Sequence, residues 1–69
     1  MNLEEIGKLI TKRREFLKLR QADLAGLSLV AEKTINQIEQ GNANPSIKTL
    51  SKITEVLGLE IVMKVKEIS

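Results

Sequence analysis

The sequence of 69 residues contains no cysteine and no histidine, and a single phenylalanine is its only aromatic residue. The lack of cysteine excludes disulfide bonds and thiolate metal sites, and the lack of histidine removes the commonest general base. The remaining carboxylates, lysines and hydroxyls are not grouped into a nucleophile with a base, a metal-ligand cluster or a phosphate-binding loop. We therefore expect no enzymatic activity, no cofactor and no metal site.

Long apolar runs are also missing. No stretch approaches the roughly 20 apolar residues that span a bilayer, and the N-terminus lacks the apolar segment of a signal peptide. We expect a cytoplasmic protein that has no membrane partner. A single domain of this length buries only about 60% of the surface that its unfolded chain exposes, so a lone monomer is marginally stable and we expect a partner chain.

Apolar residues recur with a helical period along most of the chain. The predicted helices run from residue 3 to about 19, from 21 to about 27, from 31 to about 40 and from 47 to 57. Asn2 and Ser46 are predicted N-caps, and Gly41 and Gly58 are the residue type that commonly follows a helix end. The predicted buried faces comprise Leu3, Ile6, Ile10 and Leu17, then Leu24, Ala25 and Leu27, then Val30, Ile35 and Ile38, and finally Ile47, Leu50, Ile53 and Leu57.

The second and third predicted helices form the most informative pattern in the sequence. Only residues 28–31 separate them, which leaves room for a tight corner and nothing more. This layout is that of a helix-turn-helix, in which the second helix can lie in the DNA major groove while the first crosses the backbone. The pattern therefore predicts a DNA-binding protein.

Positive charge is concentrated next to this motif. Residues 8–20 hold six basic side chains and one acidic side chain, while the net charge of the whole chain is +2. A basic segment suits contact with phosphates, which supply most of the sequence-independent affinity for DNA. A solvated, lysine-rich helix face would have the same composition, so charge alone leaves both interpretations open.

The motif also carries a family resemblance. The residues concerned are Gln21, Leu24, Ala25, Val30, Thr34, Ile35, Ile38, Glu39, Gly41, Asn44, Pro45, Ser46, Thr49 and Leu50. This pattern resembles the Cro/cI-type (XRE-like) helix-turn-helix family of phage repressors and bacterial regulators, over roughly residues 3–58. The resemblance implies an all-α domain of four to five helices (residues 1–58, motif 20–39), double-stranded DNA as the partner, and repression by a homodimer that occupies an operator.

The end of the motif and the segment after it are similar to the HipB-like subgroup of that family. They combine Ile-Glu-x-Gly, Asn-Pro-Ser and Leu-Gly-Leu-Glu-Ile, and the subgroup adds a short strand after the last helix. In this subgroup the regulator is often an antitoxin paired with a kinase-like toxin. The alternative to a plain repressor is therefore a protein whose main task is to bind a toxin, with autoregulatory DNA binding.

Three positions depart from the family pattern. Leu29 and Lys18 stand where the family usually has glycine. Because the corner between the two motif helices often needs a positive φ, we expect either a different corner or local strain at Leu29. Arg20 replaces the usual Ser or Thr cap of the second helix, and we expect its guanidinium to be free for a phosphate.

Base contacts are expected from the residues of the third helix that point away from its buried face. Glutamine can pair with adenine, lysine can reach guanine, and glutamate can accept from a cytosine amino group. By resemblance, the family's base contacts carry over to Gln21, Glu32, Lys33 and Gln37, with Thr34 and Asn36 as weaker candidates. The alternative is that all of these are ordinary solvent-exposed side chains.

Phosphate contacts are expected at the ends of the motif. The donors concerned are Arg20, the backbone around Gly41, and the side chains of Asn42 and Asn44. Backbone N–H groups and side-chain amides are suitable donors for phosphate oxygens, and they position a protein on DNA without reading its sequence. The competing interpretation of the two asparagines is turn chemistry alone.

Two charged residues occupy positions where apolar ones are expected. Arg14 lies on the buried stripe of the first helix, and Glu39 lies four residues past Ile35 in the third. Opposite charges on two inward faces predict a partly buried ion pair, and the resemblance implies the same structural role. The competing interpretation makes Arg14 another phosphate contact, although partly buried charges usually have a protein partner.

The last segment, residues 59–69, changes to a period of two, with Leu59, Ile61, Met63 and Val65 on one face. This pattern predicts a β-strand that has no second strand in the chain to pair with. We expect two copies of the strand to pair antiparallel across a homodimer, with those four residues packing onto the helices. The alternatives are a frayed tail or a surface that binds a toxin.

Overall fold

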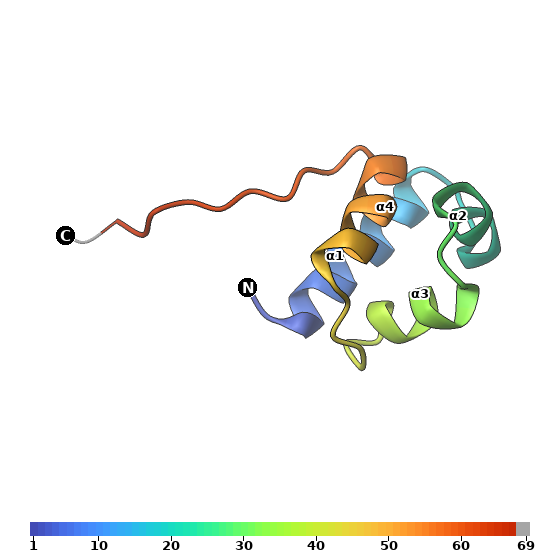
Figure 1. The fold of residues 1–69 in the computed structure, drawn as a ribbon. Helices are drawn as coiled ribbons and strands as arrows, with labels where there is room; N and C mark the ends of the chain where they lie inside the picture. The colour runs from blue at the N-terminus through green and yellow to red at the C-terminus, as the bar shows by residue number, and fades with distance from the viewer. Residues whose placement is uncertain (68–69) are drawn as a thin grey trace.

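Four helices and no strand make up residues 1–67, the part of the chain that the computed structural model describes. The helices are α1 (Leu3–Phe16), α2 (Gln21–Ser28), α3 (Glu32–Glu39) and α4 (Ile47–Leu57). α1 packs on α3 and α4, and α2 packs on the same two helices (Figure 1). The all-α architecture and the helix-turn-helix formed by α2 and α3 agree with the prediction. None of the four helices is long and apolar enough to cross a membrane.

The helix ends follow the predicted signals. The side chain of Asn2 accepts a hydrogen bond from the backbone N–H of Glu5 at 2.8 Å, and the side chain of Ser46 accepts one from Thr49 at 3.1 Å. Gly58 follows α4 with a φ of +69° and ends that helix in the left-handed conformation. Each of these residues acts as the predicted cap, because it satisfies backbone groups that a helix end leaves open.

α1 ends at Phe16, earlier than the predicted end near Leu19. Lys18 has a φ of +58°, and this left-handed residue turns the chain so that Leu19 donates its N–H to the carbonyl of Arg14 at 3.1 Å. Leu17 lies in this turn and not in the helix. It is therefore 37% exposed, and the prediction that it is buried is wrong.

Three further residues that the sequence places in the core are exposed. Leu3 is 38%, Leu27 61% and Ile47 65% exposed. Leu3 and Ile47 are the first residues of α1 and α4, at the rim of the helix packing. α2 buries Ser28 beside Leu24, and the Ser28 hydroxyl donates to the Leu24 carbonyl at 2.6 Å. The side of α2 that carries Leu24 and Ser28 faces the core, and Leu27 therefore points outward.

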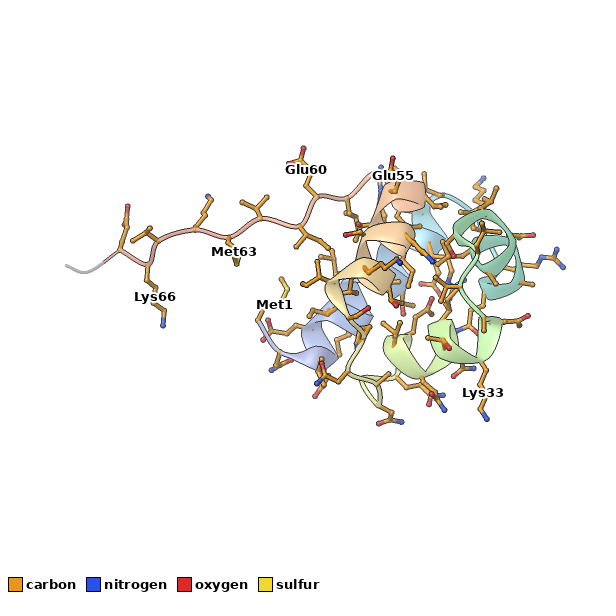
Figure 2. The ribbon with its side chains drawn as sticks, viewed as in Figure 1. Met1, Lys33, Glu55, Glu60, Met63 and Lys66 are labelled. Atoms are coloured by element: carbon orange, nitrogen blue, oxygen red, sulfur yellow. The ribbon has the colours of Figure 1, made fainter. Side chains whose placement is uncertain are left out.

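The tail formed by residues 59–67 extends away from the helices (Figures 1 and 2). Leu59 packs against the core, whereas Met63 and Val65 are 95% and 97% exposed. The predicted strand is absent from the described chain, because a strand needs a hydrogen-bonded neighbour and residues 1–67 supply none. Pairing across a homodimer requires a second copy and stays a prediction. Residues 68–69 of the predicted strand lie outside the described part.

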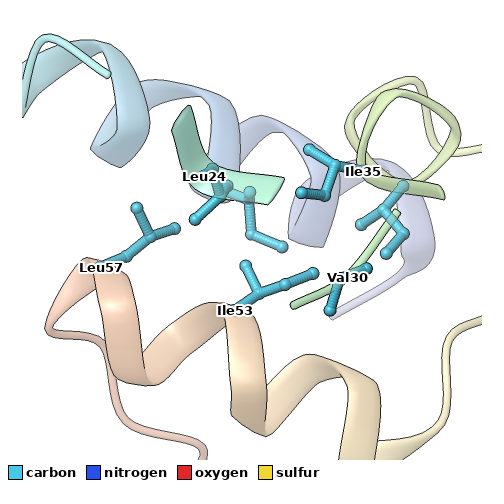
Figure 3. Close-up of a cluster of buried hydrophobic side chains, with 7 residues drawn as sticks. Leu24, Val30, Ile35, Ile53 and Leu57 are labelled. Atoms are coloured by element: carbon cyan, nitrogen blue, oxygen red, sulfur yellow. The ribbon is translucent and has the colours of Figure 1, made fainter. Parts of the chain in front are cut away.

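Seven aliphatic side chains form the buried core (Figure 3). They are Ile10, Leu24, Val30, Ile35, Ile38, Ile53 and Leu57, each at most 8% exposed, and all of them are predicted core residues. Every helix contributes to this cluster, and Val30 adds the corner between α2 and α3. Full burial of one such side chain stabilises a fold by about 1.5–3 kcal/mol, so this cluster holds α3 firmly against the other helices.

α1 rests against the end of α3 at Gly7, which is buried. A β-carbon at this position would lie 2.7 Å from the carbonyl oxygen of Glu39 and closer still to that of Ile38. Only glycine allows the two backbones to approach in this way. The sequence pattern does not single out Gly7, because the requirement depends on how the two helices cross.

Candidate nucleic-acid interface

α3 presents a polar face away from the core. Ile35 and Ile38 are 0% and 2% exposed, and Thr34 is half-buried. The exposed side chains of the helix are Glu32, Lys33, Asn36 and Gln37. Lys33 points away from the body of the molecule (Figure 2). The structure thus gathers hydrogen-bonding side chains on the outer face of a helix whose apolar side is anchored in the core.

The corner between α2 and α3 is left-handed in spite of its leucine. Leu29 has a φ of +61° and a ψ of +28°, and its N–H donates to the Ala25 carbonyl at 2.9 Å to close α2. Of the two expectations for this corner, the structure shows local strain, because a left-handed non-glycine residue costs about 1–2 kcal/mol. The leucine gains no burial in return, since it is 84% exposed.

The loop after α3 uses backbone donors to end the helix. Gly41 has a φ of +77°, and its N–H donates to the Ile38 carbonyl at 3.0 Å. The N–H of Asn42 donates to the Gln37 carbonyl at 2.9 Å. These two N–H groups, which the sequence predicts as phosphate donors, already have partners in the chain. The other donors of that predicted set are the exposed side chains of Asn42 and Asn44, of which the Asn42 amide donates one N–H to the Gln40 side chain at 3.3 Å.

Arg20 is paired with Asp23. Its guanidinium donates to the two carboxylate oxygens at 2.9 and 3.1 Å, and its backbone N–H donates to the same carboxylate at 2.8 Å. Asp23 thereby satisfies the backbone N–H of Arg20 at the start of α2, as the third helical residue of a capping box does, while no side chain takes the role of the missing Ser or Thr. These hydrogen bonds from Arg20 lower the pKa of Asp23 to about 2. The prediction that Arg20 is free is wrong, because an acid three residues further on lies within its reach. A phosphate must therefore compete with Asp23 for the guanidinium of Arg20.

Arg14 and Glu39 form the predicted ion pair between α1 and α3. Nε and Nη2 of Arg14 donate to the two Glu39 oxygens at 2.7 and 2.9 Å, and the two side chains are only 13% and 5% exposed. Nη1 of Arg14 donates to the Leu19 carbonyl at 2.8 Å, so the guanidinium is held inside the fold. Burial raises the pKa of Glu39, but hydrogen bonds from Arg14, Gln21 and Thr11 outweigh it and keep that pKa below its usual value.

Gln21 and Thr11 join this ion pair. Gln21 is half-buried at the start of α2 and donates a side-chain N–H to Glu39 at 3.1 Å, while the Thr11 hydroxyl lies 3.0 Å from the same oxygen. The sequence predicts Gln21 as a base contact, and the structure directs one of its amide donors inward. Thr11 is not predicted. Its spacing of three residues from Arg14, which puts both on one face of α1, is the signal that could have indicated it.

Residues 10–63 match the helix-turn-helix family model. The chain belongs to the Cro/cI-type (XRE-like) helix-turn-helix family. A 10 kDa protein of the ImmF control region of Bacillus phage phi105 is 33% identical over 66 residues, which cover 94% of this chain and 73% of the phage protein. An HTH-type transcriptional regulatory protein of Methanococcus maripaludis is 41% identical over 56 residues, which cover 81% of this chain but only 17% of the archaeal protein.

A solved structure extends the likeness to three dimensions. The crystal structure of the restriction-modification controller protein C.AhdI from Aeromonas hydrophila is similar with a TM-score of 0.80 at 28% identity, over 84% of this chain and 88% of that one. The family model and the solved structure confirm the predicted helix-turn-helix fold. The archaeal relative is named as a transcriptional regulatory protein, and the other two as a phage control-region protein and a controller protein. The HipB-like subgroup and a toxin partner gain no support from them.

Proposed function

We propose that this protein is a sequence-specific repressor that binds a palindromic DNA operator as a homodimer. The observation that carries the proposal is the exposed polar face of α3, on a helix whose opposite side is buried. A helix presented in this way fits the major groove, which is wide enough to admit it. Repression would follow from occupation of the operator by the bound dimer.

The exposed side chains of α3 carry the chemistry needed to distinguish bases. Gln37 can both donate to and accept from adenine, Lys33 can donate to guanine, and Glu32 can accept from the amino group of cytosine. Asn36 lies on the same exposed face and the half-buried Thr34 beside it. Phosphates would be bound by the side chains of Asn42 and Asn44, and by Arg20 when it leaves Asp23.

The extended tail is the feature that favours a homodimer. Met63 and Val65 are nearly fully exposed, and residues 1–67 offer them no covering helix. Open N–H and C=O groups beside apolar side chains favour pairing with another chain. A groove of about 270 Å³ between α1, α4 and the root of the tail, lined in part by Ile6 and Leu9, offers space for a partner's apolar side chains. To bind successive major grooves, the two α3 helices of such a dimer would have to lie about 34 Å apart, one turn of DNA.

Selection of bound duplexes from a random pool tests the DNA function, and we expect a palindrome. On the selected site, Gln37→Ala and Lys33→Ala should each weaken binding by about 1–3 kcal/mol and relax the preference at particular bases. Lys52→Ala is the matched control, because Lys52 is exposed on α4 and not on α3. Equal losses on selected and random DNA for Gln37→Ala would remove that residue from the base-reading set.

Removal of residues 59–69 tests the dimer. We expect sedimentation to show a monomer that binds the palindrome more weakly than the full chain does. Met63→Asp in the full chain should have the same effect, since a charge at this position opposes apolar pairing between tails. A truncated protein that remains dimeric and retains its affinity would place the interface elsewhere.

An antitoxin function is not part of the proposal. The related proteins described above are named as transcriptional regulators, a controller protein and a phage control-region protein. We propose a DNA-binding function and no enzymatic activity, as the composition leads us to expect.

A further inference from the structure

One carboxylate oxygen joins three helices. Oε1 of Glu39, at the end of α3, accepts from Nη2 of Arg14 at 2.9 Å and lies 3.0 Å from the Thr11 hydroxyl, both on α1. The same oxygen accepts from Nε2 of Gln21, the first residue of α2, at 3.1 Å. Only 5% of the Glu39 side chain is exposed. The ion pair therefore also holds a side chain at the start of the helix-turn-helix.

This contact determines which way the Gln21 amide points. A carboxylate accepts hydrogen bonds and donates none, so the group of Gln21 that faces Glu39 is its NH₂ and not its carbonyl oxygen. One N–H is used on Glu39, and the planar amide leaves a second N–H and the carbonyl oxygen for other partners. Gln21 is half-buried, so part of this amide remains accessible.

The Thr11 hydroxyl has two acceptors within reach. It lies 2.9 Å from the carbonyl oxygen of Gly7, one turn earlier in α1, and 3.0 Å from Oε1 of Glu39. A hydroxyl has one hydrogen, and a bond to a charged oxygen is the stronger of the two. Thr11 thus restrains the carboxylate oxygen that holds Gln21.

We propose that Thr11 is a positioning residue for DNA recognition, which acts through Glu39 to orient the amide of Gln21 toward DNA without contacting DNA itself. The inference rests on the proposed function, because it assigns to Gln21 a contact within the DNA interface. The proposed positioning role of Thr11 differs from a purely structural role in one respect. If Thr11 acts through Gln21, its contribution to binding must disappear when the Gln21 amide is removed.

The test is a double-mutant cycle on the duplex that the parent protein selects. Thr11→Val removes the hydroxyl with little change of shape, and Thr11→Ser retains it. We expect Thr11→Val to weaken binding about three- to tenfold, in the lower part of the range of coupling within one hydrogen-bond network, and Thr11→Ser to stay within about twofold of the parent. In the Gln21→Ala background, Thr11→Val should change the affinity by less than about twofold.

Thermal unfolding of each variant, followed by circular dichroism, establishes that the helices are intact at the temperature of the binding assay. An unchanged affinity for Thr11→Val in the parent background, or an equal loss in the Gln21→Ala background, would overturn the inference while leaving the proposed function intact. Failure of the parent protein to select any duplex would instead overturn the proposed function, and this inference with it.

Discussion

The two arginine–carboxylate pairs within residues 1–67 have similar hydrogen bonds and opposite surroundings. Arg14 and Glu39 approach to 2.7 Å, are 25 positions apart in the sequence, and are 13% and 5% exposed. Arg20 and Asp23 approach to 2.9 Å, are three positions apart, and are 80% and 34% exposed. The first pair joins two helices across the fold, whereas the second caps the start of one helix. Because the distances are similar, any difference between the contributions of the two pairs to stability must come from where they lie in the fold.

Solvent is the reason for this difference. An exposed pair is screened by water and salt, and its long side chains lose freedom when they are held together. A buried pair has already lost its water, so removal of one partner leaves a charge without compensation. Around Glu39 the structure adds Thr11 and Gln21 as further donors, and within residues 1–67 no buried side-chain polar atom lacks a hydrogen-bond partner.

The largest effect should follow from breaking the buried pair. Glu39→Ala should lower the free energy of unfolding by about 3–5 kcal/mol, because Arg14 then stays inside the fold without its acceptor. Chemical denaturation at neutral pH measures this loss. The control is the double variant Arg14→Met with Glu39→Leu, which should cost much less, since no buried charge is left. A Glu39→Ala midpoint within error of the parent would mean that both charges are solvated.

The pH dependence of stability should also separate the two pairs. The pKa of Glu39 is held below its usual value in the fold, so its contribution is complete above the ordinary glutamate pKa of about 4.3 and is lost as pH falls through the folded value. Asp23 behaves in the same direction, with a folded pKa of about 2. In about 1 M salt the contribution of Asp23 to the pH dependence of stability should shrink, and that of Glu39 should persist, because salt screens exposed charges more than buried ones.

Denaturation of the parent, Glu39→Gln and Asp23→Asn between neutral and acidic pH measures these contributions. We expect Glu39→Gln to flatten the acid branch of the stability curve in both low and high salt. Asp23→Asn should flatten it in low salt only. A salt-sensitive Glu39 contribution would contradict the assignment of that pair to the interior.

The pairs also show which features of this fold are visible in a sequence. Arg14 and Glu39 are predictable because a charge on an apolar helix stripe stands out. The caps Asn2 and Ser46 are predictable because they act within one helical turn. The Arg20–Asp23 pair has an equally local spacing, but the missing Ser or Thr cap suggests a free arginine, and the carboxylate three residues further on is easily overlooked.

Other features depend on contacts between elements that are distant in the sequence. Gly7 matters because α1 crosses the end of α3 there. The inward hydrogen bond of Gln21 requires Glu39 to lie beside the start of α2. The proposed pairing of two tails would need a second chain, so neither the sequence nor the structure of one chain shows it. Packing geometry therefore carries the part of the site that the residue pattern leaves undetermined.

A much smaller effect is expected when the exposed pair is broken. Asp23→Asn keeps an acceptor for the backbone N–H of Arg20 and removes the charge, so the helix cap survives. The denaturation midpoint should change little, in contrast with Glu39→Ala. Asp23→Ala is the informative comparison, because it removes the cap as well. A loss for Asp23→Asn as large as that of Glu39→Ala would show that exposure does not separate the two pairs.

The smallest expected effect, about one unit of salt dependence, concerns the proposed contact of Arg20 with a DNA phosphate. Neutralising one phosphate contributes a slope of about −0.9 to the dependence of log affinity on log salt, whatever the DNA sequence. Arg20 must leave Asp23 to make such a contact, so Arg20→Ala should flatten the slope by at most about one unit. In the Asp23→Asn background the competing carboxylate is gone, and Arg20→Ala should then cost more affinity, equally on selected and random duplexes. Titrations at several salt concentrations give both slopes. Identical slopes with and without Arg20 in the Asp23→Asn background would mean that this arginine serves only as the partner of Asp23 and meets no phosphate.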